Sequence, residues 1–228
     1  MGDQVTSLSF FSFEGFGPKW WGFKMMQFAH SKIWEIEGIE FYKLMGSGKG
    51  DGFNPWPDFS TYALLIVWEN ETSADKFIDS QVFKDYQSKA NSIHTYFLRN
   101  LHAHGTWSGS NPFRKTSTAF SDRVPIAVIT RATIKLSKLR SFWKYVPTSS
   151  KPIADQEGLL FTKGIGEVPV TQMATFSVWN SIEDVKKYAY QSKEHKKAIE
   201  MTRNLKWYKE ELFSRFIVEK EHNWQAPK

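Results

Sequence analysis

The chain contains no cysteine among its 228 residues. Disulfide bonds, thiolate metal ligands and cysteine nucleophiles are therefore excluded, and the absence fits the reducing cytoplasm. Long apolar runs are also missing, because no stretch of about 18 uninterrupted apolar residues occurs. The first residues, Met1-Gly-Asp-Gln, do not form a charged segment followed by an apolar one. We therefore expect a cytoplasmic protein that neither spans a membrane nor is exported.

Aromatic residues, in contrast, are plentiful. The chain has 10 Trp, 19 Phe and 8 Tyr, which make up 16% of it. A core rich in aromatic side chains is one explanation of this excess. A large, flat, apolar ligand or a contact with a lipid surface is the other.

The net charge of +6 is compatible with nucleic acid, anionic lipid head groups or an acidic protein as partner. The densest basic group, from Lys186 to Lys197, is interleaved with Glu183, Asp184 and Glu194, as on a solvated helix face. The stretches around Phe41 and Phe161 lack the glycine-aromatic pattern of a base-stacking sheet. We therefore expect no nucleic-acid partner.

An internal repeat organises the sequence. Glu37-Gly-Ile-Glu-Phe-Tyr-Lys-Leu-Met-Gly46 returns as Glu157-Gly-Leu-Leu-Phe-Thr-Lys-Gly-Ile-Gly166, and the segment that ends at Trp68 returns as the one that ends at Trp179. Alternating and periodic apolar positions predict strand, helix, strand, strand, helix, strand in each copy. Two such β-α-β-β-α-β units predict an α+β protein made of two ferredoxin-like repeats, arranged as a dimeric α/β barrel with a central cavity.

The expected boundaries follow from this pattern. Repeat 1 occupies residues 1–100, an irregular linker 101–123, repeat 2 residues 124–219 and a polar tail 220–228. In repeat 1 we expect strands at Val5–Phe13, Ile39–Leu44, Tyr62–Trp68 and His94–Leu98, and helices at Pro18–Glu35 and Ser73–Ala90. In repeat 2 we expect strands at Ile126–Ile134, Leu160–Lys163, Met173–Trp179 and Phe213–Val218, and helices at Leu136–Tyr145 and Ile182–Trp207.

His195 distinguishes the second copy from the first, which has Phe83 at the corresponding place once a one-residue gap is allowed. On a helix, His195 shares a face with Ala198, Ile199 and Thr202. A buried imidazole needs a hydrogen bond or a metal, so the residues leave a satisfied core histidine and a single-histidine haem ligand both open. His102-Ala-His104 is a weaker candidate for a metal pair.

The first helix carries large apolar groups on most of its faces. Trp20, Trp21, Phe23, Met25 and Met26 exceed what one buried stripe uses. Packing in the core is one explanation, and a substrate entrance that contacts a membrane is the other. In the second case, Lys24 and Lys32 would meet anionic head groups.

Several ordered motifs resemble those of the spheroidene monooxygenase family. They are Ser9-Phe-Phe-Ser-Phe13, Gly38-Ile-Glu-Phe-Tyr-Lys-Leu-Met-Gly-Ser-Gly48, Trp107-Ser-Gly109, Thr130-Arg-Ala-Thr-Ile134, Lys163-Gly-Ile-Gly-Glu-Val-Pro169, His195-Lys-Lys-Ala-Ile199 and Trp207-Tyr-Lys-Glu-Glu-Leu-Phe-Ser-Arg-Phe216. The resemblance implies a haem-containing monooxygenase that oxidises C-2 of an acyclic carotenoid with O2 and electrons from a ferredoxin-type donor. The motifs are compatible with several carotenoids and with either an alcohol or a ketone as product.

The resemblance also implies roles for single residues. His195 would be the proximal ligand of haem b iron, and Arg131 would contact the distal side or a propionate. Lys163, with Glu167, would line the cofactor pocket, and Trp107 would cover it. Ion pairs at the surface or at strand ends are the alternative for the charged residues. For the whole chain, the alternatives are a non-enzymatic haem or pigment carrier and a different haem chemistry such as aldoxime dehydration.

Overall fold

The computed structural model describes residues 3–50, 56–116, 119, 121, 124–150, 156–191 and 205–227. The first half consists of β1 (Val5–Ser12), α1 (Phe16–Trp34), β2 (Ile39–Gly48), β3 (Pro57–Trp68), α2 (Glu71–Ile78), α3 (Gln81–Gln87) and β4 (Ser92–Gly105). The second half consists of β5 (Ile126–Ile134), the 3-10 turn η1 (Leu136–Lys138), α4 (Leu139–Ser150), β6 (Leu159–Val168), β7 (Gln172–Trp179), α5 (Ile182–Gln191) and β8 (Tyr208–Gln225).

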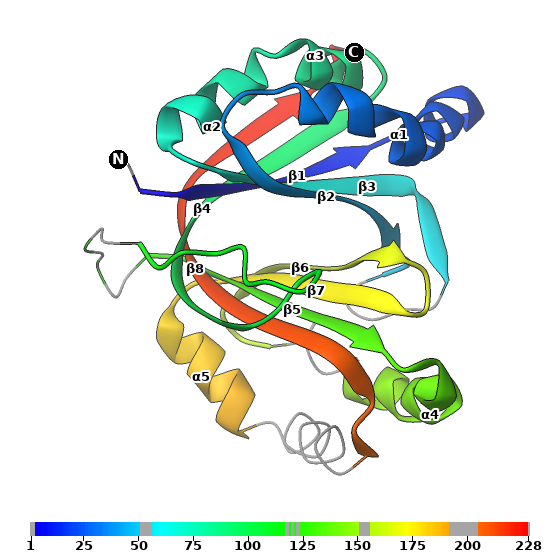
Figure 1. Cartoon of the computed structure of the whole chain (residues 1–228), viewed down its shortest axis with the longest axis vertical. Helices are drawn as coiled ribbons and strands as arrows, with labels where there is room; N and C mark the ends of the chain where they lie inside the picture. The colour runs from blue at the N-terminus through cyan, green and yellow to red at the C-terminus, as the bar shows by residue number, and fades with distance from the viewer. Residues whose placement is uncertain are drawn as a thin grey trace.

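The eight strands close into one antiparallel barrel in the order β1-β3-β2-β6-β7-β5-β8-β4. Figure 1 shows the barrel as two layers, with β1 to β4 above and β5 to β8 below. Helices α1, α2 and α3 cover the outside of the upper layer, and α4 and α5 cover the outside of the lower layer. The protein is therefore an α+β protein built on a closed eight-stranded barrel.

The repeat seen in the sequence is also a repeat of strand register. Phe41 pairs with Val67 and Phe161 with Val178, and in both hairpins a bulge precedes this pair. Where the halves meet, β2 and β6 pair through Gly46 and its own counterpart Gly166. The two halves are thus related by an approximate twofold rotation axis that passes near this glycine pair.

Two kinds of core follow from strand alternation, since successive side chains point to opposite faces of a sheet. The inner core fills the barrel with residues from all eight strands, among them Leu8, Met45, Leu65, Leu98, Ile129, Ala174, Phe176 and Phe216. The outer core of the first half lies between its sheet and α1 to α3 and includes Phe11, Leu44, Leu64, Ile66, Phe77 and Phe83. Among the residues that the structure describes, the outer clusters of the second half are much smaller.

The structure differs from the sequence expectations at several boundaries. The helix expected over Ser73–Ala90 is two helices, because the hydroxyl of Ser80 caps α3 by accepting the Phe83 N–H at 3.2 Å. Strand β4 continues to Gly105 and β8 to Gln225, because β4 pairs along its whole length with Leu212 to Gln225 of β8. The start of the expected linker and most of the expected polar tail are therefore strand. The distal part of the helix expected over Ile182–Trp207 lies outside the described residues.

Candidate functional site

The duplication gives the barrel two equivalent mouths. Phe10 on β1 and Arg131 on β5 occupy equivalent register positions, since Phe10 pairs with His94 and Arg131 pairs with Leu212. Ser12 and Thr133 are equivalent in the same way, since Ser12 pairs with Ser92 and Thr133 pairs with Glu210. Strand β6 completes the mouth that contains Phe10, and β2 completes the mouth that contains Arg131. Phe161 and Lys163 on β6 correspond to Phe41 and Lys43 on β2. The structure fills these two mouths very differently.

Trp107 plugs the mouth that contains Arg131, which we call the closed mouth. Its side chain is fully buried, and its indole Nε1 donates a 2.7 Å hydrogen bond to Glu167. The ring packs edge-on against Phe41 with centroids 5.7 Å apart. A tight turn aims it inward, with Ser108 and Gly109 at φ values of 60° and 90° and Trp107 bridged to Ser110.

A buried ion network holds this plug. The guanidinium of Arg131, 3% exposed, pairs with both Glu210 and Glu167 and lies 5.6 Å from the Trp107 ring. Lys43 adds a 2.7 Å ion pair to Glu167. Two cations thus balance two carboxylates, and the geometry of Arg131 is that of a residue that anchors the plug.

The pKa of Glu210 gives the closed mouth a measurable signature. Burial raises this pKa, but hydrogen bonds from the Gly109 N–H, Arg131 and Thr106, together with the Arg131 charge, outweigh burial and lower it to about 2. Because the folded pKa lies below the unfolded value of 4.5, the stabilisation is present above that value and is lost as the pH falls through about 2.

We expect this carboxylate to contribute roughly 3 kcal/mol to stability at neutral pH. Urea unfolding between about pH 5 and about pH 2 should show a steep loss of stability for the natural chain and a shallower loss for Glu210→Gln. Glu221→Gln, outside this network, serves as the control. Equal slopes for the natural chain and Glu210→Gln would show that the carboxylate does not stabilise the folded state in this way.

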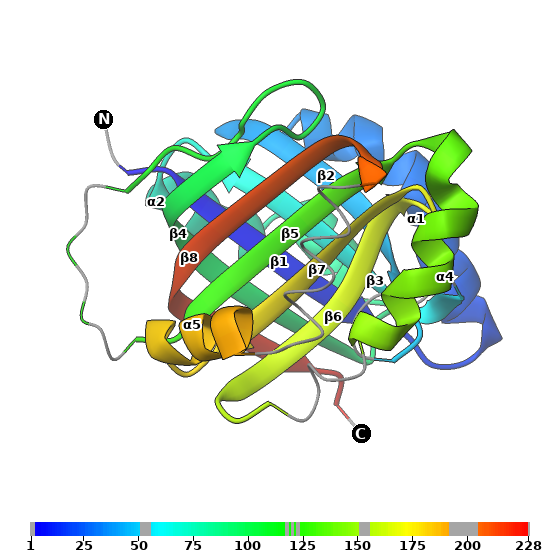
Figure 2. The same ribbon diagram turned by 90° about the horizontal axis from the view of Figure 1, so that it is seen from below.

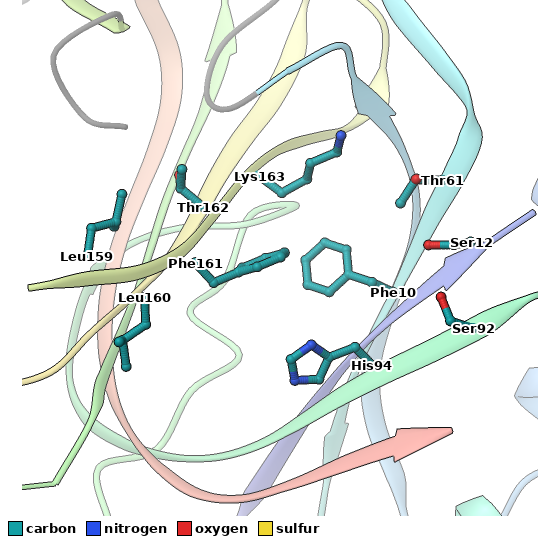
Figure 3. A pocket seen from close by; sticks show the side chains of 10 residues that line it. All are labelled: Phe10, Ser12, Thr61, Ser92, His94, Leu159, Leu160, Phe161, Thr162 and Lys163. Atoms are coloured by element: carbon teal, nitrogen blue, oxygen red, sulfur yellow. The ribbon is translucent and has the colours of Figure 1, made fainter. Parts of the chain in front are cut away.

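The other mouth is open. It contains a cavity of about 470 Å³, lined by Phe10, Ser12, Thr61, Ser92, His94 and Leu159 to Lys163. In Figure 3 the rings of Phe10 and Phe161 project into this space toward each other, with His94 beside them. Their centroids are 5.1 Å apart, and the neighbouring rings of Tyr96 and Phe176 continue the aromatic wall into the barrel. We call this site the open mouth.

Polar groups lie at the rim of the open mouth and are mostly engaged with one another. The Nε2 of His94 lies 2.8 Å from a carboxylate oxygen of Glu221, and Lys163 forms a 3.2 Å ion pair with Asp58. Strand β6 pairs with β2 only at Gly166 and Ile165, so its segment from Leu159 to Lys163 has an edge free of β2. The site is an aromatic slot with a polar rim beside a free strand edge.

A second difference between the halves lies on the outside of the barrel. Five bulky residues that pack beneath the helices of the first half correspond by register to smaller ones in the second half. The replacements are Tyr42 by Thr162, Leu44 by Gly164, Leu64 by Thr175, Ile66 by Ser177 and Phe11 by Ala132. We call these five smaller residues the low-bulk face. In Figure 2, α5 and α4 lie over opposite ends of the lower layer that carries this face.

Polar atoms on this side of the second half lack partners among the described residues. The Thr162 hydroxyl and the Arg215 Nε are buried and form no hydrogen bond there. Thr130, on the central strand β5, is exposed, whereas its counterpart Ser9 is fully buried. Buried polar groups in proteins are normally hydrogen-bonded, so these two atoms point to a group that completes this face.

The residues singled out in the sequence are thus distributed over several places. Arg131 and Trp107 meet at the closed mouth with Glu167, Lys163 lies at the open mouth, and His195 lies outside the described residues. Their roles toward a cofactor stay predictions. Sequence reasoning missed Phe10, His94 and Glu210, although aligning the two copies strand by strand would have set Phe10 against Arg131.

No family model matches the chain. The solved structure of an aldoxime dehydratase matches 98% of it with a TM-score of 0.65, covering 85% of that protein at 10% identity, which shows the fold alone. Curated relatives are much closer in sequence. A spheroidene monooxygenase of Rhodobacter capsulatus is 34% identical over 97% of this chain and 93% of its own, and one of Cereibacter sphaeroides is 34% identical over 94% and 67%. The chain is therefore an oxidoreductase that belongs to the spheroidene monooxygenase family.

Proposed function

We propose that this enzyme is a haem-dependent monooxygenase that hydroxylates an acyclic carotenoid at C-2. The named substrate of its relatives supports the carotenoid. In the balanced reaction one oxygen atom of O2 enters the C–H bond. The other leaves as water, with two electrons from a reduced ferredoxin-type donor and two protons. A second hydroxylation at the same carbon followed by loss of water would give the ketone.

The low-bulk face is the observation that supports the haem. A flat prosthetic group of this size needs a face on which side chains are small, and five outward positions of the second half carry smaller residues than their counterparts in the first half, although Ser7 and Ser9 correspond to the larger Val128 and Thr130. In the sequence, His195 lies between α5 and β8, and both of these elements belong to the half of the chain that carries the low-bulk face. With haem b bound against the low-bulk face, His195 would ligate its iron, and the haem would supply the activation of O2.

Arg215 on β8 fits the same placement. It pairs with Val128 on β5, whose neighbour across the sheet is Ser177 of the low-bulk face. Its guanidinium forms no ion pair among the described residues, and its Nε is buried without a partner. A haem propionate would satisfy both the charge and the hydrogen bond. We assign to Arg215 the propionate contact that the sequence motif had suggested for Arg131.

The open mouth suits one end of an apolar polyene. Phe10 and Phe161, which contact each other edge to face, line the cavity with aromatic carbon that suits a conjugated chain. Strand β6 contributes to both sites, since Phe161 packs against the inner core, while Thr162, which also borders the cavity of the open mouth, takes the register position of the outer-core residue Tyr42. The chain's own residues would thus hold the polyene end on one side of a single strand, exclude water from it and hold the cofactor on the other side.

The proposal extends to assembly. Each half has the strand order of a ferredoxin-like unit, β4-β1-β3-β2 and β8-β5-β7-β6, which supports two such repeats within one barrel. We expect the enzyme to form homo-oligomers, and light scattering of the purified chain measures this directly.

The experiment that tests the haem is an absorbance spectrum of the purified, haem-loaded chain with and without dithionite. We expect a Soret band that shifts on reduction, and a stoichiometry of one haem per chain. Incubation with an acyclic carotenoid and a reduced ferredoxin should then give a hydroxylated product. If the protein binds no haem and still oxidises the carotenoid, the assignment of haem as cofactor would be wrong, and the assignment of the carotenoid as substrate would stand.

A further inference from the structure

Helix α1 carries two apolar stripes. One faces the first-half sheet and contains Gly22, Ala29 and Ile33, with Trp21 and Met25 packed beside them. The other contains Phe16, Trp20 and Phe23, which are 86%, 52% and 46% exposed, and Trp34. These residues follow one another at spacings of four, three and eleven positions, so they share one side of the helix. The exposed stripe is not used by the core.

The exposed stripe continues onto the start of β3. Trp20 stacks on Phe23 with centroids 5.5 Å apart, and Phe23 meets Phe59 at 6.1 Å. Phe59 and Trp56 are themselves largely exposed. We call Phe16, Trp20, Phe23, Trp34, Trp56 and Phe59 the aromatic face. Trp20, Phe23 and Phe59 form its contiguous centre, and exposed aromatic side chains of this kind mark an interaction surface.

Lysines that form no ion pair with a described residue border the aromatic face. Helix α1 contains no acidic residue, and Lys19, Lys24 and Lys49 form no ion pair with any described residue. The nearest carboxylate on β3, Asp58, is paired with Lys163. Exposed aromatic rings together with unpaired lysines complement a surface that is apolar inside and anionic outside.

We propose that the aromatic face docks on an anionic lipid bilayer, with α1 lying in the plane of the head groups. Trp and Phe would enter the interface, and Lys19, Lys24 and Lys49 would contact lipid phosphates. None of the described helices is long and apolar enough to cross a bilayer, so the contact is peripheral. This inference depends on neither the haem nor the carotenoid.

The aromatic face adjoins the open mouth. A cavity of about 490 Å³ lies against it, lined by Lys19, Lys49, Trp56 to Phe59 and Ser60. Asp58 lines this cavity, and its partner Lys163 lines the cavity of the open mouth. The Lys163–Asp58 ion pair therefore stands between the docking surface and the aromatic slot. A lipid-dissolved molecule would reach the slot from the membrane without crossing water.

Flotation of the purified chain with vesicles tests the proposal. We expect the natural chain to bind vesicles that contain phosphatidylglycerol, and to bind pure phosphatidylcholine vesicles more weakly. The variant Trp20→Gln/Phe23→Gln should lower the partition coefficient by about tenfold or more. Lys19→Gln/Lys49→Gln should remove the preference for phosphatidylglycerol. Leu136→Gln, at a residue that is 77% exposed on the opposite layer, is the matched control and should bind as the natural chain does.

Circular dichroism should be unchanged in all three variants, because the altered side chains are exposed or, at Lys19, half-buried without an ion pair to a described residue. If the aromatic double variant fails to fold, Phe16→Gln, at the most exposed position, replaces it. Natural-strength flotation of the folded aromatic variant would overturn the proposal. A change from dimer to monomer in light scattering, with flotation unaffected, would also overturn it, because the aromatic face would then cover a second copy of the chain.

Discussion

Replacing His195 with alanine is expected to abolish stoichiometric haem binding while the apoprotein stays folded. The iron would lose its only proposed protein ligand. The haem would then lack the bond that fixes it against the low-bulk face. The inner core of the barrel consists of other residues and should hold the fold. Absorbance at the Soret band measures the first effect, and circular dichroism measures the second.

His104→Ala is the matched control, since His104 is an exposed histidine on β4 that contacts Phe213. It should bind haem as the natural chain does. A normal Soret band in the His195 variant would exclude His195 as the ligand, and a lost band in the His104 variant would transfer the assignment to that residue.

Filling the open mouth is expected to stop carotenoid turnover without affecting haem. Ser12 lies on the wall of the open mouth, and Trp107 shows how one indole blocks the equivalent space at the other mouth. Ser12→Trp should lower kcat/KM by about 100-fold or more, because the polyene end would be displaced from its reacting position. The Soret band should be unchanged, since the low-bulk face is untouched.

Ser12→Ala provides the control for Ser12→Trp. It removes the hydroxyl without filling the slot and should turn over the carotenoid at nearly the natural rate. If Ser12→Trp keeps full turnover, the polyene does not bind in the open mouth, whatever the cofactor.

Because the sequence contains an internal repeat, many strands of the barrel could be predicted from it. The match between Glu37–Gly46 and Glu157–Gly166 predicts equivalent strands, and β2 and β6 confirm it with the same register and the same bulge. The lengths of β4 and β8 could not be predicted, because a polar segment such as Glu219 to Gln225 becomes strand only through its partner. The break at Ser80 depends on a single capping hydroxyl within an otherwise helical pattern.

Side-chain direction limited what the sequence could say about the site. The sequence grouped Trp20, Trp21, Phe23 and Met25 as one excess, but the structure divides them, with Trp21 and Met25 in the outer core and Trp20 and Phe23 exposed. We therefore expect Trp20 and Phe23, and not Trp21 and Met25, to touch lipid. Likewise, the sequence left Arg131 open between a haem contact and a surface ion pair, and only the pairing of β5 with β8 places Glu210 beside it.

The measurement that tests the proposed function most directly is mass spectrometry of the carotenoid product formed under ¹⁸O2. The haem-loaded chain, reduced through a ferredoxin, should give the C-2 alcohol with one labelled oxygen from ¹⁸O2 and none from labelled water. An alcohol that carries oxygen from water, or a carotenoid that returns unchanged from a reduced, haem-replete enzyme, would contradict the account.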